Sequence, residues 1–385
     1  MSNLAGANRT KVCILTSVHL PFDGRVFHKE AKSLVKADYD VALVAQHDTE
    51  ETVDGIRILP LPKPKNRFDR ATRVAWKLLR LALKEDAHVY HFHDPELIPV
   101  GLFLKLRGRK VIWDVHEHYP NSIADRYWIP KSMRYVTSRL FDLAERVFVR
   151  FFDYVVYTTP IVGERYTRMK VRSERIDNYP IIELSESFAK DPQESVIYLG
   201  GMSKIRGIIE LIEAFHIVTR KHPKWKLRLV GRASPSSFGE EIKQLISKLN
   251  LDENVSLIPW VPYEEKERLS SQASIGIVTY LPYANNVSCL PNKLFDYMLV
   301  GLPVVVSNFP QYKEVVETDR CGLIVDPSDP ADIAKAIEYL IGHPEEAKKM
   351  GENGREAVLR RYNWGNESKK LLRIYRELLD GTAGE

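Results

Sequence analysis

The 385-residue sequence lacks long hydrophobic runs and contains only three cysteines. No stretch approaches the roughly 18 consecutive apolar residues that a membrane-spanning helix needs, so we expect no such helix. Residues 1–10 have no apolar core behind a basic start, so they do not predict a secretory signal. The cysteines, Cys13, Cys289 and Cys321, lie far apart, which predicts reduced thiols in a cytoplasmic protein and excludes a disulfide framework or a zinc site.

Short repeats, low-complexity tracts and two familiar phosphate-binding motifs are also absent. The glycine spacing of residues 200–207 does not match G-x-G-x-x-G, and no P-loop ending in G-K-[ST] occurs. These absences exclude a repeat architecture and two common ways of holding a phosphate group.

The composition is that of a globular protein with enough apolar material for two cores, with 44% hydrophobic and 28% charged residues. The net charge of +5 is uneven, because Arg57–Lys84 holds nine basic residues and one acid. A second segment, Lys131–Phe152, places Phe141, Phe148 and Phe152 near helical spacing among arginines. Both segments predict amphipathic helices on an anionic membrane surface, and ordinary core-facing helices remain the alternative. We expect no nucleic-acid partner, because apolar residues interleave with the basic ones.

Strand patterns, of which the last in the first domain covers residues 174–179, alternate with helical patterns almost throughout the chain. This alternation predicts an α/β protein with two doubly wound, Rossmann-like domains of parallel strands. The expected divisions are a first domain over 1–180, a linker over 181–194, a second domain over 195–362 and a C-terminal helix over 363–385 that returns to the first domain. Ligands bind at the carboxyl ends of such strands, so the site is expected in the cleft between the domains.

The segment Ser288–Asn308 predicts a turn, a short helix and a buried strand. Pro291 suits the first helical turn, and Lys293 and Asp296 share one face of it. A helix N-terminus that carries a lysine is an anion site, and an acid one turn on suits the hydroxyls of an attached ribose. A βαβ unit with a surface lysine remains the simpler interpretation of this segment alone.

The segment Tyr198–Phe215 predicts a strand, a glycine turn and a helix. Gly200 and Gly201 let the backbone approach a ligand. Lys204 and Arg206 lie where cations oppose the helix dipole, so they indicate an anion between them, unless the turn is simply solvated.

Polar residues follow three predicted strands of the first domain. They are His19, Asp23 and Arg25 after the first strand, His91, His93 and Asp94 after a later one, and Asp114, His116, Glu117 and His118 after a third. Histidines and acids at neighbouring strand ends suit a sugar-binding site or a metal site. We rank the metal site lower, because its ligands would come from separate strands.

Taken together, these segments resemble the family 4 glycosyltransferases of the GT-B fold over nearly the whole chain. Arg206 and Gly207 resemble the end of the family's phosphate-contacting G-x-x-x-x-x-[KR]-G segment, and residues 291–308 resemble its donor-binding E-Y-M-x-x-G-x-P-V-V segment. In the first domain, H-x-P-x-D-x-R, HDPEL and D-x-HE are similar to bacterial polysaccharide-assembly members. Two positions depart from the family pattern: its first acid falls at Ser288, and Gly201 replaces its usual arginine.

The resemblance implies a retaining, metal-independent transfer of a sugar from a nucleotide-sugar to a glycan or lipid-linked acceptor, with no cofactor. The implied catalytic residues are Arg206, Lys293 and His116. The implied donor-binding residues are Gly200, Gly201, Lys204, Gly231, Pro291, Asn292 and Asp296. The implied acceptor-side residues are His19, Asp23, Arg25, His93 and Asp94.

Arg206 and Lys293 would stabilise the leaving diphosphate, and we expect both side chains to be exposed in the empty protein. Asp296 would hold the ribose, and His116 would orient the donor sugar. Two other functions stay open: a sugar-nucleotide epimerase of the same fold, and a non-catalytic sugar-binding or membrane scaffold. The expected location is the cytoplasm or the inner face of the cell membrane.

Overall fold

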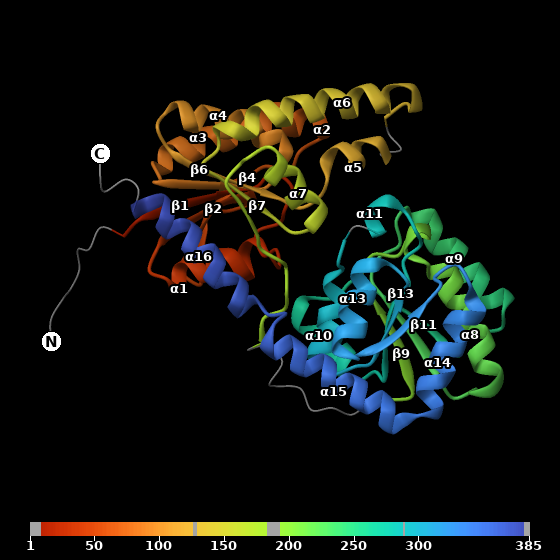
Figure 1. Cartoon of the computed structure of the whole chain (residues 1–385). Helices are drawn as coiled ribbons and strands as arrows, with labels where there is room; N and C mark the ends of the chain where they lie inside the picture. Colours follow the sequence, from red (N-terminus) through yellow and green to blue (C-terminus); the bar gives the residue numbers. More distant parts are fainter. Residues whose placement is uncertain (1–8, 126–128, 183–192, 288, 381–385) are drawn as a thin grey trace, which may run out of the picture. The chain divides into compact units, whose positions relative to one another are not determined.

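The computed structural model of the chain describes residues 9–125, 129–182, 193–287 and 289–380. The chain divides into two compact units (Figure 1). Unit 1 holds residues 1–178 and 366–385, and unit 2 holds residues 179–365. The linker expected over 181–194 lies mostly outside the described residues.

Unit 1 is built on an eight-stranded sheet in the order β3-β4-β2-β1-β5-β6-β7-β8. Its strands are β1 (Lys11–Leu15), β2 (Asp40–Gln46), β3 (Glu51–Val53), β4 (Ile56–Leu61), β5 (Val89–Phe92), β6 (Lys110–Val115), β7 (Tyr154–Tyr157) and β8 (Ser173–Arg175). All neighbours are parallel except β3 and β4. The central strands are apolar runs because helices bury both of their faces.

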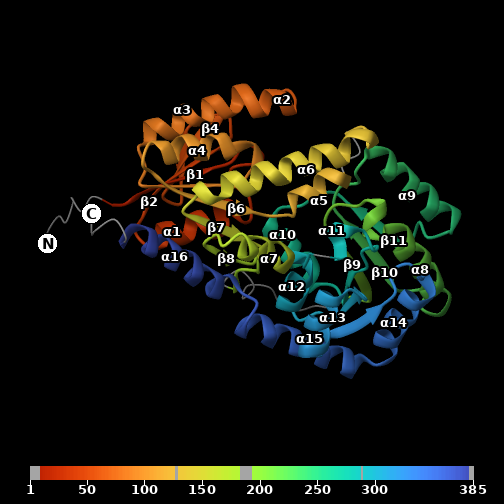
Figure 2. The ribbon, with the colours of Figure 1, turned by 45° about the horizontal axis from the view of Figure 1, so that its top comes forward.

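The helices of unit 1 cover the two faces of this sheet. They are α1 (Lys32–Lys36), α2 (Arg67–Asp69), α3 (Ala75–Glu85), α4 (Ile98–Leu106), α5 (Tyr119–Asp125), α6 (Lys131–Phe148), α7 (Pro160–Arg168) and the C-terminal α16 (Trp364–Asp380), of which residues 366–380 belong to this unit. Helices α3, α4 and α6 lie on one face of the sheet, and α1 and α16 lie on the other (Figures 1 and 2). Among the described residues, none of the helices combines the length and the apolar character needed to cross a bilayer.

Unit 2 contains an all-parallel, six-stranded sheet in the order β11-β10-β9-β12-β13-β14. Its strands are β9 (Ser195–Leu199), β10 (Lys226–Val230), β11 (Val255–Ile258), β12 (Ile275–Val278), β13 (Val304–Ser307) and β14 (Gly322–Val325). Its helices are α8 (Ile208–Lys221), α9 (Ser236–Lys248), α10 (Tyr263–Ser271), α11 (Ala284–Val287), α12 (Asn292–Leu299), α13 (Pro310–Asp319), α14 (Pro330–Gly342) and α15 (Pro344–Arg360).

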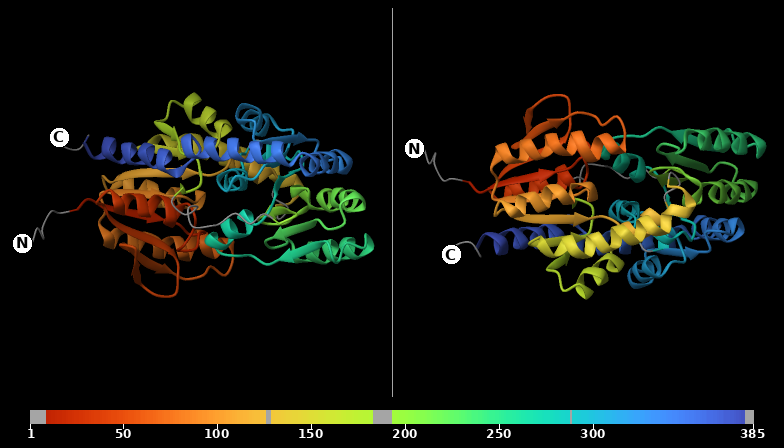
Figure 3. Two further views of the ribbon diagram at one scale, coloured as in Figure 1. Left: turned by 90° about the horizontal axis from the view of Figure 1, so that it is seen from below. Right: turned by 90° about the horizontal axis from the view of Figure 1, so that it is seen from above.

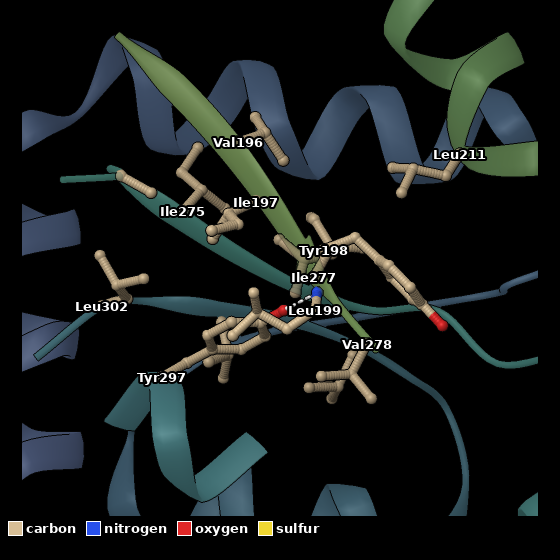
Figure 4. Close-up of a cluster of buried hydrophobic side chains, with 14 of the residues drawn as sticks. Val196, Ile197, Tyr198, Leu199, Leu211, Ile275, Ile277, Val278, Tyr297 and Leu302 are labelled. Atoms are coloured by element: carbon tan, nitrogen blue, oxygen red, sulfur yellow. Dashed lines mark hydrogen bonds between the residues drawn. The ribbon is translucent and has the colours of Figure 1, made fainter. Parts of the chain in front are cut away.

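The core of unit 2 forms where β9 and β12 pair and α12 packs against them. Figure 4 shows side chains of both strands together with Tyr297 of α12. The Tyr297 hydroxyl accepts a hydrogen bond of 2.7 Å from the backbone N–H of Leu199, so this buried phenol is satisfied within the core. The contact fixes α12 at the carboxyl end of β9.

The predicted fold class is confirmed: both units are α/β, with parallel sheets of Rossmann type. Two local expectations were wrong, and one strand was not predicted. Pro291 precedes α12 with an extended backbone (ψ 134°) and is not in its first turn. The last strand of the first domain was expected over 174–179, but β8 ends at Arg175. The short antiparallel edge strand β3 was not predicted, because its three residues carry little apolar pattern.

Candidate functional site

In unit 2, a tight turn follows β9 at the carboxyl edge of the sheet. Residues Lys204–Arg206 form one 3-10 turn, and Gly207 follows in the left-handed region at φ +68°. A Cβ atom at Gly207 would lie 1.9 Å from the carbonyl oxygen of Thr279, and one at Gly231 would lie 2.0 Å from that of Gly200. Glycine is therefore required at both positions, and the three strand ends of β9, β10 and β12 meet closely.

Two cationic side chains converge at this edge on the same pair of tyrosines. The Arg206 guanidinium carbon lies 4.6 Å from the ring centre of Tyr280, and the guanidinium donates a hydrogen bond to the Tyr280 hydroxyl. The Lys293 Nζ lies 3.5 Å from the ring centre of Tyr198 and 5.1 Å from that of Tyr280. We call these four residues the tyrosine-cation cluster.

Within the described part of the chain, neither Arg206 nor Lys293 forms an ion pair with a carboxylate, and Lys293 Nζ has no hydrogen-bond acceptor. Lys293 is only 7% exposed. Burial, followed by the positive charge of Arg206, holds the pKa of the Lys293 ammonium well below its usual value, and Asp296 only partly opposes this shift. The cluster is therefore short of one anion, and a bound anion would restore the charge of Lys293.

The expectation that Lys293 is exposed was wrong, because α12 turns its side chain under the rings of Tyr198 and Tyr280. Gly200 borders this lysine: a Cβ atom there would lie 3.3 Å from Nζ. Arg206 is half-buried. The structure thus brings Gly200, Arg206 and Lys293 together.

The other predicted donor-binding residues surround the cluster less closely. Asn292 is exposed as the first residue of α12, and Asp296 is half-buried one turn further on. Gly201 is exposed beside Gly200. Lys204 points elsewhere, since its Nζ forms a 2.8 Å ion pair with Glu241 of α9. Ser288 lies outside the described residues.

In unit 1, Asp94 organises the loop that leaves β1. One of its carboxylate oxygens, Oδ2, accepts hydrogen bonds from the Thr16 hydroxyl (2.9 Å), from the Ser17 N–H (2.6 Å) and from the Val18 N–H (3.2 Å). This carboxylate therefore joins the carboxyl ends of β1 and β5, with His93 beside it in sequence.

Asp23 closes the same loop. It accepts hydrogen bonds from the backbone N–H groups of Arg25 (2.8 Å) and Val26 (3.0 Å), and it pairs with His19 Nδ1 at 3.2 Å. Although burial opposes both shifts, this pair raises the pKa of His19 and lowers that of Asp23. The contact between His19 and Asp23 thus helps to fix the loop.

Arg25 is buried and fully engaged within unit 1. Its guanidinium contacts Asp114 Oδ2 (2.8 Å) and Glu30 Oε1 (2.8 Å) and donates to the carbonyl of Ile176 (3.0 Å). A π-helical turn over Val26–Ala31 brings Glu30 back to Arg25, because its N–H bonds the Arg25 carbonyl five residues earlier. These contacts hold Arg25 inside the unit, away from the acceptor-facing position expected for it.

Three histidines meet at the ends of β1, β5 and β6. The rings of His93 and His116 stack at 5.4 Å, with Nδ1 of His93 3.2 Å from Nε2 of His116, and the His19 ring lies 5.6 Å from that of His116. His93 is buried, whereas His116 keeps part of its side chain exposed. Burial lowers the pKa of His116, so its imidazole is neutral at neutral pH and can hydrogen-bond a sugar hydroxyl without changing protonation.

Glu30, His91, His93 and Asp114 place potential metal-ligating atoms within 4.8 Å of one another, and all four side chains are buried. Burial raises the pKa of Glu30 well above its usual value, whereas Arg25 keeps Asp114 ionised against the effect of burial. The charges of the Arg25 guanidinium and the Asp114 carboxylate therefore cancel, and the histidines around them are neutral. A metal ion would have to displace the Arg25 guanidinium from both acids.

Sequence reasoning missed the tyrosines of the cluster, the acid Glu30 and the hydroxyl of Tyr375. Tyr375 of α16 lies 3.0 Å from Nδ1 of His91 and so closes the histidine group from the C-terminal end of the chain. Tyr198 and Tyr280 were visible as aromatic residues at the ends of predicted strands, which is the one signal that could have pointed to them.

Two family models match consecutive parts of the chain. Residues 24–180 match the glycosyl transferase 4-like domain, and residues 182–357 match glycosyl transferases group 1. An uncharacterized glycosyltransferase of Haemophilus influenzae is 21% identical over 86% of this chain and 90% of its own length. The alpha-D-kanosaminyltransferase of Streptomyces kanamyceticus is 24% identical over 51% of this chain and 49% of its own, so that match spans about half of each protein.

Solved structures share the fold over almost the whole chain. Sucrose-phosphate synthase from Thermosynechococcus elongatus superposes with a TM-score of 0.77 at 19% identity, covering 97% of this chain and 100% of that one. Anabaena HepE in complex with UDP-glucose gives 0.73 at 14% identity, covering 96% and 100%. With both domain families matched in order, the chain belongs to the family 4-like glycosyltransferases of the GT-B fold.

Proposed function

We propose that this glycosyltransferase moves a sugar from a nucleotide-sugar to a glycan or lipid-linked acceptor with retention of configuration, in the assembly of a cell-surface polysaccharide or glycolipid. The observation that carries the proposal is the tyrosine-cation cluster, where Arg206 and Lys293 converge and neither forms an ion pair with a carboxylate of the described residues. Buried cations without counter-ions are costly unless a ligand supplies the anion.

A leaving nucleoside diphosphate is an anion of the right kind. In the transfer, the bond from the anomeric carbon to the diphosphate oxygen breaks, a bond to the acceptor oxygen forms, and the acceptor proton passes to the leaving phosphate. Arg206 and Lys293 would stabilise the charge that develops on the diphosphate, so the reaction would need neither a metal ion nor a cofactor. His116 would orient the donor sugar, and Asp296 would hold the ribose.

The relatives support this chemistry in general terms. Anabaena HepE has been solved in complex with UDP and glucose and with UDP-glucose, and we propose a nucleoside diphosphate-hexose of the same class as the donor here. The reaction would take place in the cytoplasm or on the inner face of the cell membrane.

The test begins with binding. Thermal-shift measurements with UDP, GDP, ADP and their sugars should single out one base, because a ligand at 100 times its Kd stabilises the folded protein by about 2.7 kcal/mol. Arg206→Ala and Lys293→Ala should then each lower turnover by about 100-fold.

Lys221→Ala is the matched control, because this exposed lysine of α8 forms a surface ion pair with Glu338. It should keep wild-type turnover. Wild-type turnover in both cluster variants would refute the diphosphate site. Release of nucleoside diphosphate together with an epimerised sugar, in the absence of any acceptor, would identify an epimerase instead.

A further inference from the structure

Helix α6 of unit 1 and the 3-10 turn that follows it, Val149–Phe151, expose a continuous apolar stripe. Its members follow one another at intervals of three and four residues and are each between 45% and 63% exposed: Met133, Val136, Leu140, Leu143, Val147 and Phe151. This spacing keeps them on one side of the helix. Along α6, from Met133 to Val147, the stripe is about 21 Å long.

The stripe is not the side of α6 that holds the fold together. Phe141 and Phe148 point the other way and pack against the core of unit 1. Glu145, on the same inner side, is buried and bonds Arg165 (2.8 Å) and the Tyr166 hydroxyl (2.6 Å). A second apolar side beyond the one that packs indicates an interaction surface, since contiguous exposed apolar area of this kind is uncommon without a partner.

The charges around the stripe are of one sign. Lys131, Arg139, Arg146 and Arg150 are exposed along it. The acids of α6 are withdrawn from the surface, because Asp142 is held by Arg146 and Arg165 and Glu145 is buried. The exposed side of the helix therefore presents apolar groups and cations, without an exposed acid.

A basic cavity of about 580 Å³ opens beside this side of α6. Its lining includes five arginines and two acids: Arg139, Arg146, Arg150, Arg165, Arg168, Asp142 and Glu164. The net positive lining suits the phosphate of a lipid headgroup.

The neighbouring helices on the same face of the sheet continue this character. Helices α3, α4 and α6 lie side by side on that face (Figures 2 and 3). Trp76 of α3 is 64% exposed with Lys77 beside it, and Leu106 of α4 is 86% exposed with Arg107 beside it. We give the name basic apolar face to the surface that the exposed residues of these helices form, from Phe68 of α2 to Phe151 after α6.

We propose that the basic apolar face docks on an anionic lipid bilayer, with the α6 stripe lying in the plane of the headgroups. An amphipathic helix with apolar residues on one side and Lys and Arg around them binds membranes in this way. A second copy of the chain is a poor occupant, because the same face on both copies would oppose cations to cations. This inference rests on the surface alone and does not depend on the proposed reaction.

Co-sedimentation with vesicles tests the proposal. The full chain should pellet with vesicles that contain phosphatidylglycerol, should stay largely in solution with pure phosphatidylcholine, and should be released by salt. The double variant Leu140→Gln/Leu143→Gln should bind the anionic vesicles about 10-fold more weakly, since two side chains leave the apolar contact. Its melting temperature should be unchanged, because both leucines are exposed.

Leu359→Gln is the matched control, an exposed leucine of α15 in unit 2, and it should bind as the wild type does. Arg139→Glu/Arg150→Glu should weaken binding to anionic vesicles, and the binding that remains should not depend on the salt concentration. Equal binding to neutral and anionic vesicles, no binding to either, or equal binding by the leucine double variant would each overturn the proposal. So would a lipid-free dimer, seen by sedimentation velocity, that the leucine variant abolishes.

Discussion

Each unit places an arginine at the carboxyl edge of a parallel sheet, buried in unit 1 and half-buried in unit 2, but the two units treat its charge in opposite ways. In unit 1, Arg25 lies between Asp114 and Glu30, with a backbone carbonyl as a third partner. In unit 2, Arg206 lies on the ring of Tyr280 beside a second cation, Lys293. A cation that finds its anions within the fold stabilises the fold, whereas a cation that finds only aromatic rings is kept for a ligand.

The largest expected difference between the two arginines is in what each contributes to stability. Arg25→Met should lower the free energy of unfolding of unit 1 by about 3–5 kcal/mol, because it leaves the ionised Asp114 buried without its cation. Arg206→Ala should cost less, about 1–2 kcal/mol, since it removes a cation–π contact and one hydrogen bond to the Tyr280 hydroxyl but leaves no buried charge without its partner. Urea unfolding followed by fluorescence, with both variants side by side, measures the difference. Equal losses of stability would erase the distinction between a structural and a ligand-directed cation.

The next effect separates the histidine group from the diphosphate site. His116→Ala should lower sugar transfer by about 10- to 100-fold, the cost of one lost hydrogen bond to a buried polar group. Affinity for the bare nucleoside diphosphate should stay within about twofold of the wild-type value, because that ligand is proposed to lie on unit 2. Initial rates measure the transfer, and calorimetry measures the affinity. His88→Ala is the control, a histidine at the amino edge of the same sheet, where its Nδ1 accepts from the Lys11 N–H.

A fall in diphosphate affinity as large as the fall in transfer would contradict the proposed role of His116. Chelation with EDTA belongs to the same experiment and should leave the wild-type rate intact. If chelation abolishes transfer and zinc or manganese restores it, the cluster of Glu30, His91, His93 and Asp114 becomes a metal site, and Arg25 must move to admit the ion.

The smallest effect concerns the protonation of Lys293. Burial depresses its pKa in the empty protein, and a bound diphosphate would raise that pKa again. Between these two pKa values, binding takes up a proton, so affinity for the nucleoside diphosphate should fall by up to about tenfold per pH unit as the pH rises. Calorimetry in buffers of different ionisation heat should detect the uptake in the wild type and its loss in Lys293→Met. A pH-independent affinity in the wild type would mean that Lys293 is charged before the ligand arrives.

The sequence predicted the central strands well because a parallel strand buried on both faces is an unbroken apolar run, as in Val304–Ser307. It failed at the sheet edges. The strand expected over 174–179 ends early because Arg25 and Lys29 take the carbonyls of Ile176 and Asn178, so side chains replace a neighbouring strand.

The candidate site was predictable one segment at a time. The glycine turn and the short helix each carried a cation in their local pattern, which identified Arg206 and Lys293. The rings that cover them could not be predicted, because Tyr198 and Tyr280 meet only when β9 and β12 pair. Likewise, the pattern of α6 marked the phenylalanines as its apolar side, and only packing shows that another apolar side faces outward.

The division of the chain also sets an order of events during synthesis. Unit 1 begins with the first strand but also includes residues 366–385, so the Tyr375 hydroxyl that meets His91 is made only after the whole of unit 2. At about 5–20 residues per second, the whole of unit 2 is made during the roughly 10–40 s in which unit 1 waits for its final helix. Unit 1 is therefore completed only after unit 2 has been made, and a chain cut short before α16 leaves the histidine group open along one side.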